Sequence, residues 1–505
     1  MSERRRSAFL GMFFGYTGLM ISLARNILLV PVYLQKIPLA EYGAWLATGG
    51  ALALILINDY GLSGVVTQRI SASYGAGEFA ALGRLAGSAL AIGTMLAIGL
   101  SAISMVFVPF LPGLGTLNAS ESHTVVMCFT LAIAANAFGV IGATAASVIR
   151  SLQKVVLGGT ITLVAEFANV VVIVIGLFAG HGLYALAAGL LVRSLIITGA
   201  GLIGVWFVCE RSLKTTIEIE PAAVRDLLGE SSRFFLSAIA IRLQGQASVF
   251  FVGSILGPAS AAIYSLTVRA HETVFMVIML INGSLVPSVT HLFGSGDIAR
   301  FRVVVLRLLV FLAALTALAM TITVILNPAF LALWVGKSAF AGQSVSILMA
   351  VAVFISAITS IAYDALLAQG KFRLVTRYFI FTAILQVSLL VSLLRWGLWV
   401  APFVTIVTIC VWGTAFWLNV AESISVTAGE VRALLAQMTR IVAVSVGGAA
   451  AFGIFYPTAT SWASLVVEAV VCGLCLTSAY LVASSSLRRI TYEEIGTTFR
   501  LFRAS

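Results

Sequence analysis

Runs of apolar residues separated by short polar segments repeat along the whole chain. Each run is about 20 residues or longer, which is the length that a helix rising ~1.5 Å per residue needs to cross a ~30 Å hydrocarbon core. The pattern therefore predicts an all-α polytopic membrane protein with fourteen transmembrane helices. We expect these helices at residues 9–32, 43–66, 86–110, 124–148, 156–179, 183–208, 234–256, 260–287, 304–326, 343–367, 374–395, 398–420, 439–457 and 461–483.

The composition supports this fold class and excludes a soluble domain. Of the 505 residues, 60% are hydrophobic and only 10% are charged, whereas soluble domains carry about 25% charged residues. The five cysteines lie in or beside predicted spans, and Cys472 and Cys475 form a CxxC inside a helix without companion histidines. We interpret them as packing residues, so the sequence predicts no metal ligand, no cofactor and no catalytic residue.

Basic residues are distributed unequally between the two sides of the predicted spans. If the amino terminus is cytoplasmic, the inner loops and both tails hold 23 of the 30 Lys and Arg. The other seven lie in outer loops or within spans: Lys36, Lys337, Arg395, Arg25, Arg193, Arg242 and Arg269. Because basic loops stay inside, we expect both termini to be cytoplasmic. The net charge of +11 then reflects topology and contact with anionic membrane lipids, and not nucleic-acid binding.

An internal repeat relates two parts of the chain at an offset of 219 residues. "YGAGEFAAL" (74–82) matches "FGSGDIARF" (293–301), and weaker matches pair "EYGAW" (41–45) with "SAAIY" (260–264) and "QK" (153–154) with "FR" (372–373). We expect two six-helix bundles in the same orientation, related by a pseudo-two-fold axis along the membrane normal. The predicted parts are the bundles 1–208 and 234–420, a cytoplasmic linker 209–233, a cytoplasmic amphipathic segment 421–438, two additional helices 439–484 and a cytoplasmic tail 485–505.

Two polar segments carry a similar amphipathic pattern. "VRDLLGE" (224–230) lies in the linker, and "VRALLAQ" (431–437) precedes the thirteenth span. Each places one valine and two leucines on one face of a helix, which is typical of a short helix on the membrane surface.

Several segments resemble bacterial polysaccharide flippases. "PLAEYGAW" (38–45), "NDYGL" (58–62), "YGAGEFAALGRLAGSA" (74–89) and the 6+6+2 layout are similar to Wzx-type flippases of O-antigen and exopolysaccharide assembly. These belong to the multidrug/oligosaccharidyl-lipid/polysaccharide exporter (MOP) superfamily.

The resemblance implies a V-shaped pair of bundles in the bacterial inner membrane. The implied cargo is an undecaprenyl-diphosphate-linked oligosaccharide, moved from the cytoplasmic to the periplasmic leaflet by alternating access. Other membrane proteins of polysaccharide assembly are implied partners. Lipid II flippases are close relatives, in which spans 13 and 14 contribute a groove for the lipid tail.

Arginines within the spans are the candidate cargo ligands. A lipid diphosphate is an anion crossing an apolar layer, and the planar guanidinium binds phosphate oxygens in pairs. Arg25 lies about eight residues below the outer end of the first span, and Asp59 in the second span is roughly 12 Å deeper. A local partner for Arg25 is therefore not expected. We expect Arg25, Arg242 and Arg269 to contact the diphosphate.

The remaining intramembrane charges have other predicted roles. Arg193 and Glu166 are level about the turn near residue 180, which favours a structural ion pair. Asp59, Glu272 and Asp364 are candidate coupling or cavity residues, with coupling to protons, sodium or the membrane potential left open.

Three alternative functions remain open. A cation-coupled multidrug exporter of the same superfamily favours acidic cavity residues, whereas the first span carries Arg25 and no acid. A lipid II flippase shares the cargo chemistry proposed above. A membrane polymerase or ligase acting on the same lipid carrier needs a catalytic group on a sizeable polar loop, and the outer loops are short and hold none.

Overall fold

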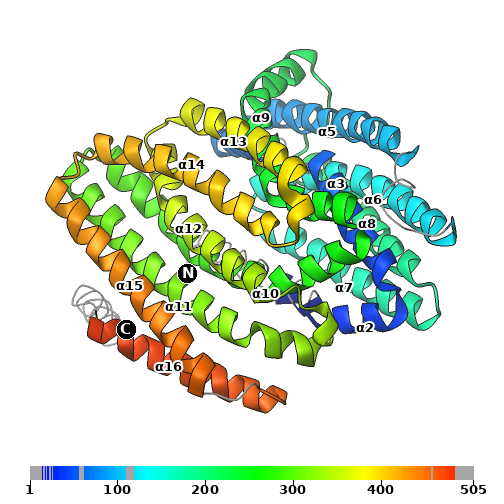
Figure 1. Cartoon of the computed structure of the whole chain (residues 1–505). Coiled ribbons are helices and arrows are strands. Elements are labelled where there is room, and N and C mark those ends of the chain that lie inside the picture. Colours follow the sequence, from blue (N-terminus) through cyan, green and yellow to red (C-terminus); the bar gives the residue numbers. More distant parts are fainter. Residues whose placement is uncertain are drawn as a thin grey trace. The chain divides into compact units, whose positions relative to one another are not determined.

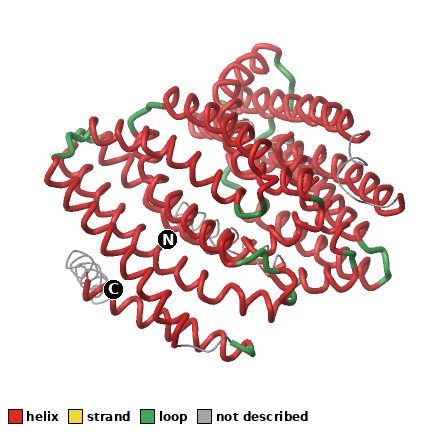
Figure 2. The backbone as a smooth tube through the Cα atoms, in the orientation of Figure 1, coloured by secondary structure: helices red, strands yellow, loops and turns green. Residues whose placement is uncertain are grey.

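Helices make up the chain wherever the computed structural model describes it. The described residues are 14, 17–18, 20–21, 24–25, 27–55, 62–109, 119–455 and 459–483. Within these ranges the chain forms helices joined by short turns and contains no strand (Figure 2). They divide into two compact units, Met1–Ala262 (unit 1) and Ile263–Ser505 (unit 2), which are described separately below.

Among the described residues, twelve helices are long and apolar enough to cross a membrane. They coincide with the third to the fourteenth predicted spans, so the all-helical polytopic fold is confirmed. The first two predicted spans include residues outside the described ranges, and the total of fourteen stays a prediction. In chain order the helices are α2 (Val30–Lys36), α3 (Leu39–Ile55), α4 (Leu62–Ala76), α5 (Phe79–Phe107), α6 (Ala119–Ser151), α7 (Val155–Phe178), α8 (Leu183–Trp206), α9 (Pro221–Leu256), α10 (Pro258–Gly294), α11 (Ile298–Trp334), α12 (Gln343–Ala368), α13 (Phe372–Leu393), α14 (Val400–Ser423), α15 (Ala428–Phe455) and α16 (Trp462–Ala483).

Unit 1 is built around the packing of α8 against α6 and α7. Its main core cluster joins α4, α5, α6 and α8 through fully buried aliphatic side chains such as Ile70, Leu82 and Ile149. α9 packs against α3 and α5 in the same unit. The repeat instead groups residues 234–256 with the second bundle. The division by packing therefore falls later in the chain than the division by sequence repeat, which stays a prediction.

The polar linker between the repeats is docked along α5 as a strap without regular secondary structure, residues 213–220. The hydroxyl of Thr215 donates to the Phe79 carbonyl at 2.8 Å, and the Glu220 N–H donates to the Ser88 hydroxyl at 3.0 Å. Gly87 permits this approach, because a Cβ there would overlap the carbonyl oxygen of Glu218. The strap is therefore held by backbone and side-chain hydrogen bonds over two turns of α5.

Unit 2 consists of the rest of α10 and the helices α11 to α16 (Figure 1). α12 packs against α11 and α14, and α13 packs against α14. The last two helices, α15 and α16, both pack against α11 through a cluster that includes Val310, Ile441 and Cys472. The two helices outside the repeat thus share one partner helix.

The best-matching repeat segments form the same turn. Gly77 precedes α5 with φ +75°, and Gly296 precedes α11 with φ +78°, a conformation that glycine adopts without the steric cost of a Cβ. In each turn the glycine N–H donates to the carbonyl three residues earlier, at 3.3 and 3.0 Å. The N–H two residues later donates to the glycine carbonyl, at 3.0 and 2.9 Å. The local geometry agrees with duplication at this site.

A second pair of turns matches at a slightly different offset. The Lys154 N–H donates to the Ile149 carbonyl at 3.2 Å, and the Lys371 N–H donates to the Leu366 carbonyl at 3.0 Å. These positions are 217 residues apart, so the expected match of residues 153–154 with 372–373 is displaced by two residues. The second repeat is shorter by two residues between its two turns.

The two amphipathic segments are not short separate helices, and that expectation is wrong. Residues 224–230 form the start of α9, and residues 431–437 form the start of α15. No proline interrupts either helix after these segments, so the backbone hydrogen bonds continue into the apolar part.

Candidate functional site

Arg25 has an ion-pair partner on α7, although the sequence predicted none. Its Nη1 lies 3.1 Å from Oε2 of Glu166. Phe14, eleven residues earlier, packs against Gly159, which lies two turns before Glu166 on α7. A Cβ at Gly159 would overlap the phenyl ring of Phe14. Residues of the predicted first span therefore contact α7, the fifth predicted span. The expectation compared Arg25 only with the neighbouring second span, which is why it missed this partner.

Glu166 joins two arginines rather than one. Its Oε1 lies 2.6 Å from Nε of Arg193 on α8, while its Oε2 faces Arg25. The side chain of Glu166 is 8% exposed, against 21% for Arg25 and 31% for Arg193. Arg193 and Glu166 are thus level across the turn between α7 and α8. The carboxylate sits deepest, and the two guanidiniums extend from it towards more accessible space.

Asn169 completes the group from the next turn of α7. It is 2% exposed. With its amide oxygen oriented towards Arg25, Asn169 accepts from Nη1 of that arginine and its amide nitrogen donates to the Gly189 carbonyl at 3.1 Å. The hydrogen bond to Gly189 joins α7 to the backbone of α8 at a position where α8 has no side chain. Asn169 was not among the predicted site residues.

The group formed by Arg25, Glu166, Asn169 and Arg193 is called the arginine cluster below. Two cations share one anion, so the cluster carries one unbalanced positive charge within the membrane-spanning helices. Placing an arginine at the centre of a bilayer costs about 2.5–3.5 kcal/mol on insertion scales. One carboxylate offsets only one of the two guanidiniums. Chemically, the cluster is suited to hold an additional anionic group.

The other two predicted diphosphate ligands lie elsewhere. Arg242 is an exposed residue of α9 in unit 1, and it forms no salt bridge with any described acidic residue. Arg269 lies on α10 in unit 2, where its Nε is buried without a hydrogen-bond partner among the described atoms. Glu272, one turn further along α10, is exposed. Contact of Arg242 and Arg269 with a cargo stays a prediction.

The remaining candidate acids are placed as follows. Asp364 on α12 accepts a hydrogen bond of 2.7 Å from the amide of Asn282 on α10, and the same amide lies 3.3 Å from the Ser360 hydroxyl. The Asp364 side chain is partly buried. Its described hydrogen-bond donor is the neutral amide of Asn282 and not a cation. Asp59 lies outside the described residues.

A buried polar group in unit 2 also escaped prediction from the sequence. The Ser346 hydroxyl lies 3.2 Å from Nε2 of His271 and 3.2 Å from the amide nitrogen of Asn327, and Asn327 also donates to the Thr267 carbonyl at 3.0 Å. All four residues are at most 1% exposed. They connect α10, α11 and α12 by hydrogen bonds, as buried polar groups in a bilayer must be connected.

Family models match most of this chain. The model of the polysaccharide biosynthesis protein family matches residues 19–293, and the MatE model matches residues 234–391. The chain belongs to the polysaccharide biosynthesis protein family. The whole arginine cluster lies within the region that this family model matches. No curated protein sequence gives a significant match.

Solved structures share the fold of this chain. The lipid II flippase MurJ in an inward closed conformation gives a TM-score of 0.71 at 13% identity, over 96% of this chain and 100% of that chain. An inward-facing multidrug resistance MATE family transporter of the MOP superfamily gives 0.65 at 14% identity, over 81% and 94%. A MOP superfamily transporter from Pyrococcus furiosus gives 0.57 at 13% identity, over 83% and 94%.

These findings agree on the class of protein. The fold is that of MOP superfamily exporters and flippases, and the family match assigns the chain to the polysaccharide group. Twelve of the described helices are long and apolar enough to cross a membrane, as in a multi-pass membrane protein.

Proposed function

We propose that the protein flips a polyprenyl-diphosphate-linked oligosaccharide from the cytoplasmic to the periplasmic leaflet of a bacterial inner membrane. The cargo serves the assembly of a cell-surface polysaccharide, and movement follows alternating access between the two repeats. The arginine cluster is the observation that carries this proposal. It supplies unbalanced positive charge on helices of unit 1 that are otherwise apolar.

The cluster has the chemistry to hold a diphosphate. A guanidinium carries five N–H donors, and the bonds to Glu166 and Asn169 use only part of those on Arg25 and Arg193. The free donors suit phosphate oxygens, which guanidiniums bind in pairs. Glu166 orients both arginines before the cargo arrives, so less side-chain freedom is lost when the phosphates bind.

The other intramembrane charges complete the proposal. Arg242 and Arg269 add cationic contacts along the path of the cargo. Asp59, Glu272 and Asp364 are candidate groups for coupling transport to protons, sodium or the membrane potential. Asp364 is the acid whose surroundings favour this most, because its described partners are an amide and no cation.

The test is translocation by the purified protein in vesicles that contain a fluorescent polyprenyl-diphosphate oligosaccharide. We expect Arg25→Ala and Arg193→Ala each to slow translocation about tenfold or more, which corresponds to the loss of ~1.4 kcal/mol of cargo interaction. Arg25→Lys retains the charge without the paired donors, so we expect an intermediate rate. Arg69→Ala is the matched control, because Arg69 pairs with Glu230 on an exposed surface. Wild-type rates for both alanine variants at wild-type protein levels would sink the proposal.

Lipid II is the second candidate cargo. The likeness to a lipid II flippase covers 96% of this chain, and lipid II also presents a diphosphate to the arginines. Parallel assays with lipid II and with an oligosaccharide on the same carrier separate the two candidates by rate.

A multidrug exporter is the third candidate. A cationic drug would be repelled by the unbalanced charge of the arginine cluster. We therefore expect no transport of cationic dyes by the reconstituted protein, and dye transport without glycolipid transport would favour the exporter.

A further inference from the structure

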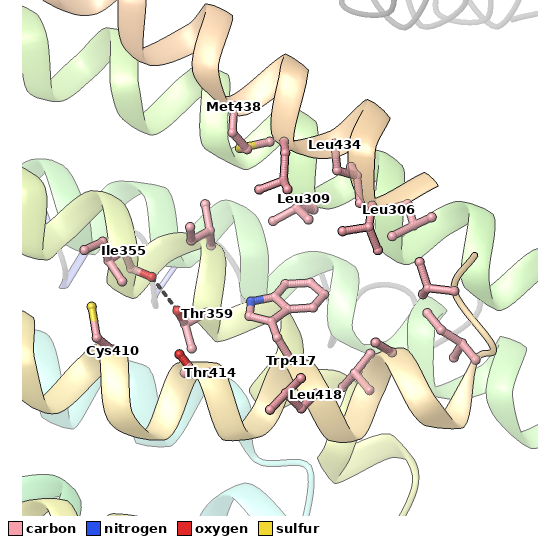
Figure 3. A pocket seen from close by; sticks show the side chains of 18 of the residues that line it. Leu306, Leu309, Ile355, Thr359, Cys410, Thr414, Trp417, Leu418, Leu434 and Met438 are labelled. Carbon is pink, nitrogen blue, oxygen red and sulfur yellow. Dashed lines mark hydrogen bonds between the residues drawn. The ribbon is translucent and has the colours of Figure 1, made fainter. Parts of the chain in front are cut away.

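Unit 2 contains an apolar cavity of about 460 Å³ between α14 and α15, with α11 and α12 behind it (Figure 3). Leu309, Ile355 and Met438 are among the side chains that line it. The indole of Trp417 extends from α14 into the space between the two helices. At about 30 Å³ for a group the size of a water molecule, the cavity holds roughly fifteen such groups. The cavity is therefore large enough for part of a hydrocarbon chain.

The cavity persists because α15 is held away from α14. On its other side α15 packs against α11 and α16. At its start, Thr427 and Glu430 form a capping box, in which the Thr427 N–H donates to the Glu430 carboxylate at 2.8 Å and the Glu430 N–H donates to the Thr427 hydroxyl at 3.3 Å. Arg302 of α11 then fixes this end, with Nη2 3.4 Å from the Glu430 carboxylate. α15 is thus positioned by contacts other than those with α14.

The mouth of the cavity is apolar and accessible from the side. Leu418 on α14 and Leu435 on α15 both line the cavity and are 66% and 61% exposed. In a membrane-spanning unit, exposed leucines at this place face hydrocarbon and not water. An apolar cavity is not filled by water, and an empty one loses the dispersion contacts along its wall. A hydrocarbon chain from a surrounding bilayer would restore these contacts.

One end of the cavity is basic. Lining residues Ile424 and Val426 flank Ser425, whose carbonyl accepts a hydrogen bond of 3.1 Å from Arg302. The Nε of Arg302 is buried without a hydrogen-bond partner among the described atoms. Lys371 reaches the same turn and donates to the Ser423 hydroxyl at 2.7 Å. Glu430 pairs with Arg302, and Glu422 beside the turn is exposed. The Nε of Arg302 and the ammonium of Lys371 are the donors that are placed here to bind an anion.

We propose that this cavity binds one acyl chain of an anionic membrane phospholipid, with its phosphate at the Ser423–Val426 turn between Arg302 and Lys371. The lipid fills the gap that the packing of α15 leaves open and ties α15 to α14. The site differs in its lining from the lipid-tail groove that the family resemblance implies for spans 13 and 14, because α11, α12 and α14 line it together with α15, and α16 contributes no lining residue. The proposal is independent of which cargo the protein carries.

Photolabelling of the full-length protein tests the site. The protein is reconstituted in phosphatidylcholine vesicles doped with phosphatidylglycerol that carries a photoactivatable diazirine on one acyl chain. We expect crosslinked peptides from α14 and α15. Ala421→Trp and Thr414→Trp, which place an indole at lining positions, should each lower this labelling about tenfold, the factor that corresponds to ~1.4 kcal/mol of binding.

Matched variants separate site effects from folding effects. Leu474→Trp adds the same side chain at an exposed position of α16 outside the cavity, so labelling should stay at the wild-type level. Arg302→Gln and Lys371→Gln should abolish the preference for phosphatidylglycerol over a phosphatidylcholine probe while chain labelling remains. The unfolding midpoint of each variant in detergent is compared with that of the wild type. Two tryptophan variants and two glutamine variants are made, so that each test still stands if one variant does not fold.

Two results would overturn the proposal. One is unchanged labelling of α14 and α15 in both tryptophan variants that fold as the wild type does. The other is displacement of the label by a polyprenyl phosphate but not by excess phosphatidylglycerol, which would assign the cavity to the cargo's isoprenoid tail.

Discussion

The sharing of Glu166 by two arginines makes a specific prediction about stability. Replacing either Arg25 or Arg193 by Gln leaves the carboxylate with one cation, whereas replacing both leaves it buried and unpaired. The side chain of Glu166 is only 8% exposed, so water cannot take the place of the lost partners. We therefore expect the double variant to be destabilised by more than the sum of the two single variants.

The magnitudes follow from the exposure of each partner. Each arginine is partly accessible, at 21% and 31%, and its removal also removes its own cost of burial. A hydrogen bond to a charged group contributes about 1.5–3 kcal/mol, and the removed burial cost of the arginine offsets part of it, so each single variant should lose about 1 kcal/mol. Leaving a buried charge unpaired costs about 3–5 kcal/mol. The excess over additivity is then about 1–3 kcal/mol, which is within the range measured for coupled residues.

Equilibrium unfolding of the purified variants in detergent measures these differences. Adding Glu166→Gln to the double variant removes the unpaired charge, so the triple variant should be more stable than the double. Arg25→Gln combined with Arg395→Gln is the control, because Arg395 is exposed on a turn of unit 2. The reasoning is refuted if the double variant equals the sum of the singles within about 0.5 kcal/mol, or if the triple variant is no more stable than the double.

Two further predictions concern close packing and a buried acid. Gly87→Ala should destabilise the protein by about 1–3 kcal/mol, because its Cβ would overlap the Glu218 carbonyl of the docked strap. Gly99→Ala on the same helix meets open space and should cost nothing, so equal unfolding midpoints for the two variants would contradict the packing. Asn282→Leu should cost about 1–3 kcal/mol by leaving the Asp364 carboxylate without its 2.7 Å donor. Adding Asp364→Asn should recover part of that loss, and no recovery in the unfolding midpoint would show that the hydrogen bond is not the cause.

Helix positions and local turns were predictable because they depend on neighbouring residues. Apolar runs of span length located the third to fourteenth spans, and the glycines at 77 and 296 marked two turns with the same backbone conformation. Arg193 and Glu166 lie level because a tight turn joins their helices and sets the register directly. In each case the relevant information lies within about one helical hairpin of sequence.

The partner of Arg25 depends on which helices face each other, and the hydrophobic pattern does not determine this. All faces of a helix in a bilayer can be apolar, so the pattern lacks the polar stripe that marks the outside of a soluble helix. Arg25 meets Glu166 across 141 residues of sequence. The same reason explains why Asn169 and the hydrogen bonds around Ser346 were not found. An acid or amide inside an apolar run signals a polar contact, but not the helix that provides it.

The docked strap also has a practical consequence for anyone who modifies this protein. The linker is the longest polar stretch between spans, which makes it the obvious place for an epitope tag, a protease site or a fluorescent reporter. The strap is hydrogen-bonded to α5, so such an insertion would break these bonds and expose Ser88. A tag in this stretch therefore perturbs the packing against α5 and not only an exposed loop.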